Sequence, residues 1–339
     1  MGSKDFQSLQ VAGPFPWLEG TGTDGGGLHF PLPLDVVLDE AGQAHPLGLL
    51  LMENAVHSSP LPALAVSPVP ARKDQPSGFI ASTTIESYLS GKLNRLSGQD
   101  AVLSHDKLFA PEYRIGVAID PSSQSAADGE LYAATHARPV EGFRLAAWMG
   151  LKKPLPDEAG KLRQLDFLLL GGERRIARIH REKLALSIPA TPASPDGDGP
   201  VVLKWILATP AVFAHGWLPG WCRDSRKDRP PLPDHEVCLP LTSGRARLLA
   251  TCQGKPLAFA GWDTVEHRAK PTQLAIPAGS VFYFLCQNTA TARELAKLLH
   301  WRPRSDVFGE KGFGYGFAAP FTGAMSPDIQ QFAKSYFGS

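Results

Sequence analysis

The sequence predicts an α+β fold in which short strands outnumber helices. Residues 201–208, apolar except for Lys204, and the apolar residues 281–285 are segments of strand length that are rich in β-branched and aromatic residues. Thr291 and Glu294 have the spacing of a capping box, in which two side chains satisfy backbone N–H groups at the start of a helix. Strands interrupted by a few helices are typical of the α+β class.

The first half of the chain is rich in turns before it becomes rich in strands. Thr83 and Glu86 form another capping-box pair and start a short helix. Gly91 ends this helix, because glycine readily adopts the left-handed conformation found past a helix end. Residues 92–111 form a polar insertion. Strands are expected at residues 36–38, 49–52, 114–120, 130–140 and 143–150.

The second half combines further strands with two helices. The helix that follows Thr291 has one apolar face, and Pro303 ends it because proline lacks the backbone N–H that continues a helix. Ser326 and Pro327 start a terminal helix that ends before Gly338, since proline suits the first helical position. Strands are expected at residues 165–170, 176–184, 201–208, 245–251 and 281–285.

The overall composition excludes several functional classes. The chain has 339 residues and 43% hydrophobic content, which is enough for a substantial core. A net charge of +1 excludes a protein that coats polyanions over its whole surface, so any RNA contact must come from local basic patches. No apolar run reaches the length of a bilayer span, and we expect no membrane partner and a cytoplasmic location.

The cysteines give no sign of a metal site or a disulfide framework. Cys222, Cys238, Cys252 and Cys286 are scattered and form no C-x-x-C pair, the spacing that structural zinc sites use. We therefore expect no metal, no cofactor and a reducing compartment.

Residues 261–285 combine a basic loop with a strand that should be buried. Arg268 and Lys270 lie close in sequence to Trp262, so this loop contains two cations and an aromatic ring. The Pro-Ala-Gly-Ser turn at residues 277–280 then leads into the apolar strand. A solvated basic loop is thus joined directly to the core.

A glycine-rich loop follows at residues 309–317. Its four glycines, one lysine and three aromatic residues suit a loop whose backbone N–H groups approach a phosphate while its rings stack on bases. It is not a P-loop, because Lys311 is followed by Gly312 and not by Ser or Thr. The alternative is a glycine-rich bulge whose aromatic residues belong to the core.

Several blocks, in this order along the chain, resemble one known family. They are RIGVAID at 114–120, GELYA at 129–133, FLLLGGERR at 167–175, and GWD with KPTQLAIPAGSVFYF within 261–284. Together with the glycine-rich loop they resemble the third subunits of the Cmr complex, the type III-B CRISPR effector, within the RAMP superfamily. The likeness covers residues 13–317 and is most specific in the PAGS block.

The resemblance implies ferredoxin-like RAMP modules with long loop insertions. One module would span residues 1–150, with a projecting thumb-like insertion at about 84–112. The other would span residues 151–339 and carry the glycine-rich loop at 309–316. The family opens with a strand and helix whose motif is rich in proline, phenylalanine and an Arg-Asp pair. This motif has no counterpart here, so we expect the first module to be incomplete.

The resemblance also implies a non-catalytic RNA-binding subunit that acts in antiviral defence. The family binds the repeat-derived 5′ tag of the guide RNA, docks the large signalling and nuclease subunit, and caps the filament of backbone subunits. Guide RNA and these two subunits are the implied partners, and target RNA is an indirect one. Single-stranded RNA is read by stacking and by hydrogen bonds to base edges, which arginines and aromatic residues supply.

The candidate RNA-binding residues lie in basic or glycine-rich segments. Glu173 either orients one of the two following arginines toward a phosphate or pairs with it as an ordinary exposed turn residue. The polar residues on the predicted strands either face RNA or are ordinary exposed positions. The candidates are Arg114, His136, Arg138, Arg174, Arg175, Arg268, Lys270, Lys311, Gly312, Gly314 and Tyr315.

Two other functions stand beside this one. A metal-independent endoribonuclease that processes guide RNA would need a positioned general acid-base such as histidine. His136, His180, His215 and His267 have basic neighbours, but no cluster of recognisable catalytic spacing surrounds them. We therefore expect no catalytic residues. A structural adaptor that contacts only proteins is the third hypothesis.

Overall fold

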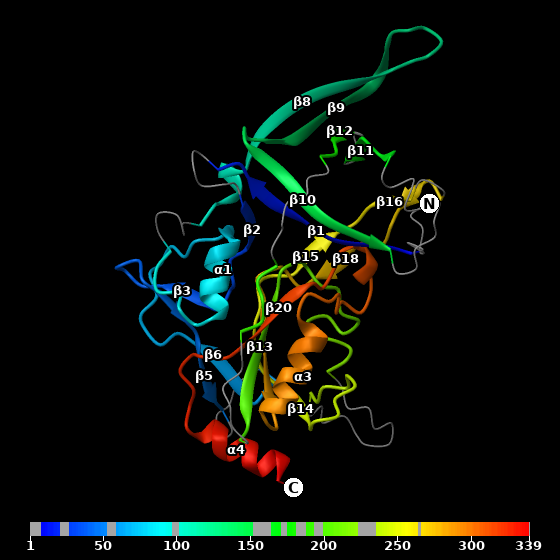
Figure 1. The fold of residues 1–339 in the computed structure, drawn as a ribbon. Helices are drawn as coiled ribbons and strands as arrows, with labels where there is room; N and C mark the ends of the chain where they lie inside the picture. The colour runs from blue at the N-terminus through cyan, green and yellow to red at the C-terminus, as the bar shows by residue number, and fades with distance from the viewer. Residues whose placement is uncertain are drawn as a thin grey trace.

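Two four-stranded antiparallel sheets organise this chain (Figure 1). The computed structural model describes residues 8–20, 27–52, 59–96, 102–151, 164–170, 175–180, 188–192, 199–222, 235–263 and 266–338. One sheet comes from the first half of the chain and the other from the second half. The α+β class is confirmed, with mostly antiparallel strands and few helices among the described residues.

The first sheet has the strand order β10-β1-β2-β7. Each neighbouring pair is antiparallel, and β1 has a partner on both sides. The strands are β1 (Leu9–Leu18), β2 (Gly27–Pro31), β7 (Phe79–Ala81) and β10 (Phe143–Leu151). Helix α1 (Ser82–Leu89) follows β7 directly and buries Ile85, Tyr88 and Leu89. These side chains anchor the helix to the core.

The second sheet has the order β14-β19-β13-β20, so β19 and β13 are its central strands. The strands are β13 (Val201–Leu207), β14 (Ala246–Cys252), β19 (Val281–Cys286) and β20 (Gly316–Pro320). Every residue of β19 and β20 is buried, as expected of a sheet covered on both faces. The three strands predicted at 201–208, 245–251 and 281–285 are confirmed to within one residue at each end.

The remaining strands form two-stranded hairpins. They are β3 (Val36–Leu38) with β4 (Ala44–Pro46), β5 (Gly48–Leu51) with β6 (Ala63–Val66), β8 (Phe109–Ile119) with β9 (Ala126–Pro139), β11 (Phe167–Leu170) with β12 (Arg175–Arg178), β15 (Leu257–Phe259) with β18 (Gln273–Ala275), and β16 (Trp262–Asp263) with β17 (Arg268–Ala269). The predicted strands of the first half are confirmed, and β8 and β9 begin earlier than predicted. Of the strand predicted at 176–184, residues 181–184 lie outside the described residues.

The β8–β9 hairpin projects from the body of the molecule (Figure 1). The sequence places a thumb-like insertion at about residues 84–112, but α1 in that range packs into the core and residues 105–107 form a short 3-10 helix, η2 (His105–Lys107). The projecting hairpin begins at Phe109, within the last residues of that range, and continues beyond it to Pro139.

Both helices with predicted capping boxes are present, but neither begins at the predicted pair. Helix α3 (Thr289–Leu299) is capped by Asn288, whose side chain accepts a hydrogen bond of 2.8 Å from the Thr291 N–H. Glu294 instead accepts hydrogen bonds from the N–H groups of a neighbouring loop. Helix α1 starts from β7 without a side-chain cap, because the preceding residue is Ala81. The sequence signal therefore found both helices but misplaced their first residues.

The helix ends are predicted better than the starts. Gly91 has a φ of 69° past α1, as the sequence predicts. Helix α3 ends at Leu299, before Pro303. The terminal helix α4 (Asp328–Phe337) has Pro327 at its N-cap and Gly338 at its C-cap, within one residue of the prediction.

One buried cluster continues from one half of the chain into the other. Aromatic rings join the two sheets, with Phe15 and Phe317 each 5.0 Å from Phe30 between ring centroids. Trp301 stacks on Phe317 at 5.4 Å. The same cluster includes α4 through Ile329. The two halves therefore share a core.

A buried polar group lies where the halves meet. The Asp35 carboxylate accepts hydrogen bonds from the hydroxyls of Tyr88 at 2.6 Å and Tyr283 at 2.9 Å. The Lys204 ammonium lies 3.6 Å from the centre of the Tyr88 ring. Burial lowers the pKa of Lys204 to about 8, although the charge of Asp35 acts to raise it. Charged and hydroxyl groups from both halves are thus held together away from water.

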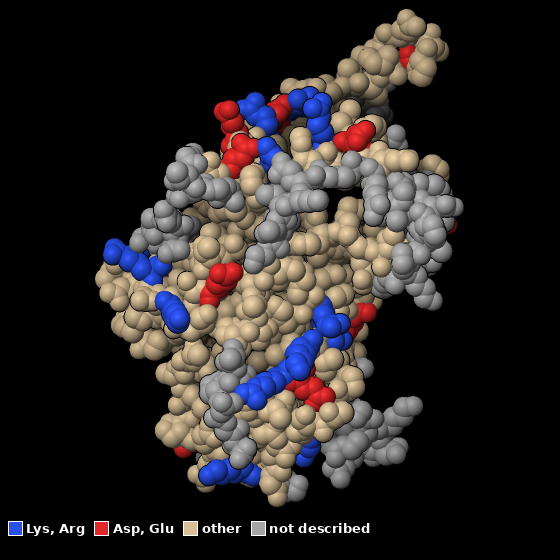
Figure 2. All heavy atoms as spheres, viewed as in Figure 1, with Lys and Arg blue, Asp and Glu red and all other residues tan. Residues whose placement is uncertain are grey.

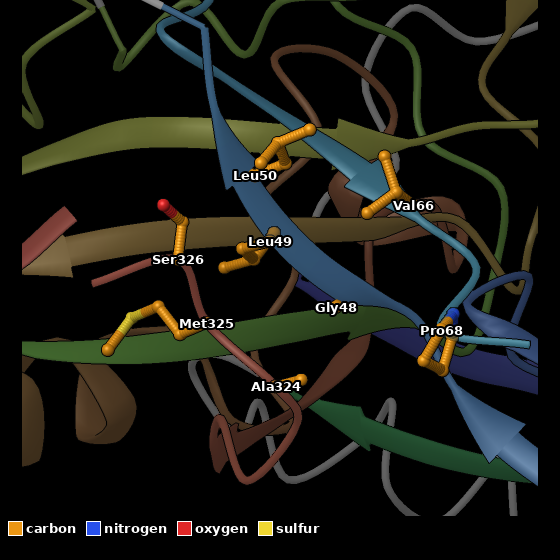
Figure 3. A pocket seen from close by; sticks show the side chains of 8 residues that line it. All are labelled: Gly48, Leu49, Leu50, Val66, Pro68, Ala324, Met325 and Ser326. Atoms are coloured by element: carbon orange, nitrogen blue, oxygen red, sulfur yellow. The ribbon is translucent and has the colours of Figure 1, made fainter. Parts of the chain in front are cut away.

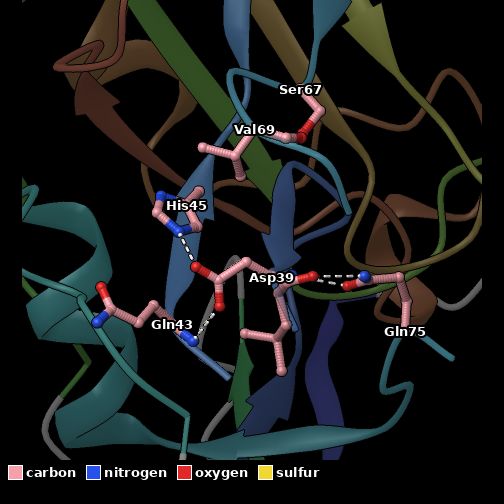
Figure 4. A network of polar contacts seen from close by, with 7 residues as sticks. Asp39, Gln43, His45, Ser67, Val69 and Gln75 are labelled. Carbon is pink, nitrogen blue, oxygen red and sulfur yellow. Dashed lines mark hydrogen bonds and ion pairs between the residues drawn. The ribbon is translucent and has the colours of Figure 1, made fainter. Parts of the chain in front are cut away.

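A smaller polar network fixes the β3–β4 hairpin (Figure 4). The Asp39 carboxylate accepts hydrogen bonds from the Gln43 N–H at 2.8 Å and from His45 Nε2 at 3.0 Å. The Gln75 amide bonds to both backbone groups of Leu38 at 2.8 Å. The Asp39–His45 pair closes a turn, and these hydrogen bonds explain why the two side chains lie together.

One surface hollow is apolar. It has a volume of about 240 Å³ and lies between β5, β6 and the segment before α4 (Figure 3). Its lining contains no charged residue, so it does not suit a polyanion; the lining is Gly48, Leu49, Leu50, Val66, Pro68, Ala324, Met325 and Ser326. Among the described residues, no helix has the length and hydropathy needed to cross a membrane.

Candidate nucleic-acid interface

The β8–β9 hairpin has one polar face and one apolar face. In a paired ribbon, cross-strand partners share a face and successive residues alternate between faces. Glu112 is opposite His136, and Arg114 is opposite Ala134. Arg138 is two residues beyond His136 and therefore lies on the same face. Three of the candidate residues predicted from the sequence thus share one side of the hairpin.

Glu112 is the centre of this polar face. Its carboxylate accepts a hydrogen bond from Arg114 Nε at 2.7 Å. The pKa of Glu112 is lowered first by this bond and then by the positive charges of Arg114, Arg138 and Arg175. Arg114 bonds to this carboxylate and the positive charges of Arg138 and Arg175 also act on it, which leaves a local excess of positive charge. Charged residues of both signs gather at the root of the hairpin, while the tip carries few (Figure 2).

Arg175 reaches this group from another hairpin. It is the first residue of β12, which pairs with β11, and it is exposed. The neighbouring Gly-Gly-Glu-Arg turn, which includes Glu173 and Arg174, lies outside the described residues. The structure therefore brings a residue of the predicted GGERR turn next to the predicted strand residues, although they are far apart in the sequence.

Tyr132 adds an aromatic ring to the polar face. It is opposite Gly116 and half exposed. A Cβ atom at Gly116 would collide with the Tyr132 ring, so glycine is what allows the ring to lie across the neighbouring strand. A ring held against the ribbon beside guanidinium groups is suited to stacking on a base while the cations bind phosphates.

The other face of the hairpin is apolar and uncovered in the described part of the chain. Tyr113 is 80% exposed, Ile115 is 77% exposed and Leu131 is 71% exposed. Monomeric proteins rarely leave several large apolar side chains together in water, and such patches mark interaction surfaces. The alternation of polar and apolar residues along the two strands is the sequence signal that could have revealed this surface.

The second basic segment forms another β-ribbon. β15 pairs with β18 and β16 pairs with β17, so residues 257–275 form a hairpin with an irregular middle. Arg268 is exposed opposite Asp263, and the stem of Lys270 passes over Gly261. Trp262 lies on the opposite face of the ribbon and is 60% exposed.

The glycine-rich loop does not have the predicted free N–H groups. The Gly312 N–H donates to the Gly309 carbonyl at 3.2 Å, and the Gly314 N–H donates to the Pro210 carbonyl at 2.8 Å. The Tyr315 N–H donates to Thr209 Oγ1 at 2.9 Å. The expected phosphate cradle is therefore corrected to a packed turn, because its donors already have acceptors within the chain.

The side chains of this loop are also largely enclosed. Tyr315 is only 7% exposed and packs against Trp301 at 5.6 Å between ring centroids, so its ring is not open to a base. Gly314 has a φ of 77°, and a Cβ atom there would collide with the backbone of Ser305. Close packing therefore requires glycine at position 314.

The loop and the second ribbon touch. Phe259 of β15 stacks on Phe313 at 5.1 Å, and Phe308 joins the same aromatic group. Lys311, in the short helix η3 (Gly309–Lys311), places its ammonium 4.9 Å from the centre of the Phe308 ring. The structure thus brings Lys311 to the root of the ribbon that carries Arg268.

The histidines that could serve a nuclease lie on separate elements. His136 is on β9, and His267 is in the turn between β16 and β17. His180 follows β12, and His215 lies between β13 and β14. Among the described residues, no group of three or more His, Cys, Asp or Glu side chains is placed to hold a metal ion.

The chain matches one protein-family model over nearly its whole length. The model is described as CRISPR-associated protein (Cas_Cmr3), and it matches residues 2–321. No curated protein matches the sequence.

Two of the solved structures similar to this chain come from Cmr complexes. One is a cryo-EM structure of the type III-B Cmr-beta bound to cognate target RNA and AMPPnP, with 12% identity and a TM-score of 0.38; the match covers 86% of this chain and 70% of that one. The other is the type III-B Cmr-beta bound to cognate target RNA, with 14% identity, the same TM-score, and 86% and 67% of the two chains covered.

The family match extends over the blocks at 114–120, 129–133, 167–175 and 261–284 that carry the sequence resemblance. This chain belongs to the Cas_Cmr3 family of CRISPR-associated proteins.

Proposed function

We propose that this chain is a non-catalytic RNA-binding subunit of a type III-B Cmr effector complex. In this proposal it binds the repeat-derived 5′ tag of guide RNA and docks the large signalling subunit. The observation that carries the RNA-binding part is the polar face of the β8–β9 hairpin. There Arg114 and Arg138 share one side of a projecting ribbon, and Arg175 approaches from a second hairpin.

The chemistry of this face fits single-stranded RNA. Guanidinium groups bind phosphate oxygens through paired N–H donors, and Arg114 is already oriented by Glu112. Tyr132 offers a ring to a base, and His136 offers a donor or acceptor to a base edge. On this one rigid ribbon, the cations can bind the phosphates of a single strand while the aromatic ring stacks on an unpaired base.

The second ribbon is the other RNA contact that we propose. Arg268 and Lys270 are two residues apart on one face, and Lys311 lies at the root of the same ribbon. These cations would hold backbone phosphates whatever the tag sequence. Because Gly312, Gly314 and Tyr315 are engaged in packing, their contribution would be to position this ribbon.

The apolar face of the β8–β9 hairpin supports the docking of another subunit. Tyr113, Ile115 and Leu131 would be covered in an assembly, and a nearly neutral chain with exposed apolar residues suits a place inside one. We assign this face to the large signalling subunit or the adjacent backbone subunit.

We also propose that residues 151–339 form a ferredoxin-like module. Support comes from the second sheet, whose four strands have the order and directions of a βαββαβ unit, with α3 as its second helix. No helix lies between β13 and β14 among the described residues, so the first helix of such a unit has no counterpart there. Residues 1–150 would form the other module.

RNA binding can be tested on the polar face. We expect the Arg114→Gln, Arg138→Gln double variant to bind labelled guide RNA more weakly by fluorescence anisotropy. The slope of log K against log salt should fall by about 0.7 for each phosphate that is no longer neutralised. Lys255→Gln with Lys334→Gln is the matched control, since it removes two exposed cations elsewhere. Unchanged affinity and slope in the folded double variant would refute this site.

Tag recognition needs a separate comparison. Guide RNA with its natural tag should bind more tightly than RNA with a scrambled tag of the same length. Tyr132→Ala should reduce this preference, since stacking and base-edge contacts depend on sequence. If the two RNAs bind equally, the subunit contacts only the RNA backbone and does not recognise the tag.

A further inference from the structure

A second group of cations lies at the C-terminal end of α3, far along the molecule from the β8–β9 hairpin (Figure 1). Lys and Arg side chains form a band across the face that carries α3 (Figure 2). Lys297 is exposed in the last turn of the helix, and Arg302 and Arg304 follow in the next segment. None of these residues is among the candidates predicted from the sequence.

The end of the helix holds the two arginines in place. Arg302 Nε donates to the Lys297 carbonyl at 3.1 Å, and Arg304 Nε donates to the Leu298 carbonyl at 2.6 Å. Each bond satisfies a carbonyl that the helix leaves without an intrahelical partner. A guanidinium has five N–H donors, and each bond uses one of them. Within the described residues no other acceptor takes the remaining donors, which can therefore bind an anion.

Helix capping explains these two bonds but not the whole arrangement. Cations are favoured near a helix C-terminus, which accounts for their presence in purely structural terms. Yet the two guanidiniums bond to the carbonyls of consecutive residues, Lys297 and Leu298, so their positive charges lie close together. The pKa of Arg304 is accordingly lowered, first by burial and then by the charge of Arg302. Two adjacent guanidiniums without a counter-charge repel each other, and an anion between them would relieve that repulsion.

The nearby carboxylates are occupied elsewhere. Glu294 of α3 accepts hydrogen bonds from the N–H groups of Thr242 and Ser243 at 2.9 Å. Asp306 accepts from the N–H groups of Ala214 and Gly220, also at 2.9 Å. Within the described residues, no carboxylate forms an ion pair with Lys297, Arg302 or Arg304.

We propose that Lys297, Arg302 and Arg304 form a phosphate clamp that binds the backbone of an RNA strand. Arginine pairs suit phosphate because their planar N–H groups match its oxygens, and the third cation, from the last turn of α3, extends the site to a neighbouring phosphate. The clamp contains no aromatic ring and would bind RNA of any sequence. This inference rests on the proposed function, since it adds a second RNA surface to the same subunit.

The test uses the full chain and a labelled oligouridylate, which has no tag sequence. Losing two phosphate contacts should lower the magnitude of the salt slope by about 1.4, so a variant that binds as the parent does at 1 M salt should bind roughly 25-fold more weakly than the parent at 0.1 M. We expect this for the Lys297→Gln, Arg302→Gln variant. Arg302→Lys, which keeps the charge, should retain most of the slope. The Lys255→Gln, Lys334→Gln control should bind as the parent protein does.

The outcomes separate this clamp from the hairpin site. If the clamp variant binds RNA unchanged while the Arg114→Gln, Arg138→Gln variant is weakened, the clamp is refuted and the proposed function stands. If both are weakened, their free-energy losses should add in the combined variant, because the sites share no residues. Loss of binding to polyglutamate but not to RNA would show an acidic peptide site and overturn the proposal. A melting temperature equal to that of the parent shows that each variant is folded.

Discussion

The buried group around Asp35 and Lys204 gives the most quantitative prediction. The pKa of Lys204 falls from 10.5 to about 8, mainly through burial. At 1.36 kcal/mol per pKa unit, this difference of about 2.5 means that burying the protonated lysine costs about 3.4 kcal/mol below pH 8. Between pH 8 and 10.5 the unfolded chain keeps the proton and the folded chain does not, so this cost declines and stability rises with pH.

Asp35→Asn removes the negative charge that partly offsets this cost. An uncompensated buried charge typically costs 3–5 kcal/mol, so we expect a loss of about that size at pH 7. Without Asp35 the pKa of Lys204 should fall further, because Asp35 is the group that raises it. The variant should therefore gain stability as the pH rises from 7 to 9, by at most about 1.36 kcal/mol per unit.

A second substitution tests the reasoning. Asp35→Asn with Lys204→Met leaves no unpaired charge, so the double variant should be more stable than Asp35→Asn alone. The measurement is urea unfolding followed by circular dichroism, with free energies from linear extrapolation. A loss below about 1 kcal/mol for Asp35→Asn, or no recovery in the double variant, would contradict the charge argument. The same pH series measured on the double variant gives the pH dependence contributed by the other titratable groups, which is then subtracted.

Three further predictions concern single side chains. Tyr132→Ala should weaken single-stranded RNA binding by about 1–3 kcal/mol because a stacking ring is removed, with no change in salt slope by anisotropy. Asn288→Ala should lower the free energy of unfolding by about 1 kcal/mol, because the Thr291 N–H loses its cap; Asn288→Asp is the control that keeps an acceptor. Gly314→Ala should destabilise the fold by about 2 kcal/mol or more, since alanine is strained at this φ and collides with Ser305, and RNA affinity of the folded fraction should not change.

The elements of the fold with strong local patterns could be predicted from the sequence. Residues 281–286 are a continuous apolar run, and residues 201–207 are interrupted only by Lys204, and such segments leave little choice but a buried strand. The helix end at Gly91 follows from the ease with which glycine adopts a positive φ. Helix starts could not be fixed, because Asn288 and Thr291 are both good caps and only tertiary contacts decide between them.

The candidate site was predicted less completely, and for a physical reason. The glycine-rich pattern at 309–316 is the same whether its N–H groups face a phosphate or the chain itself. Only the fold shows that Pro210 and Thr209 take up those donors. The group around Glu112 could not be assembled from sequence either, because Arg175 comes from a hairpin more than sixty residues along the chain.

A net charge of +1 does not describe the local electrostatic potential that a polyanion encounters at the surface of this protein. Several carboxylates are held by backbone N–H groups and not by Lys or Arg side chains. Glu294 and Asp306 close loops in this way, and Asp39 closes the β3–β4 turn. The arginines on the β8–β9 hairpin and beyond α3 therefore dominate their own neighbourhoods, although the chain as a whole is balanced. Because exposed charges are screened within about 10 Å at 0.1 M salt, these local excesses decide where an RNA strand binds.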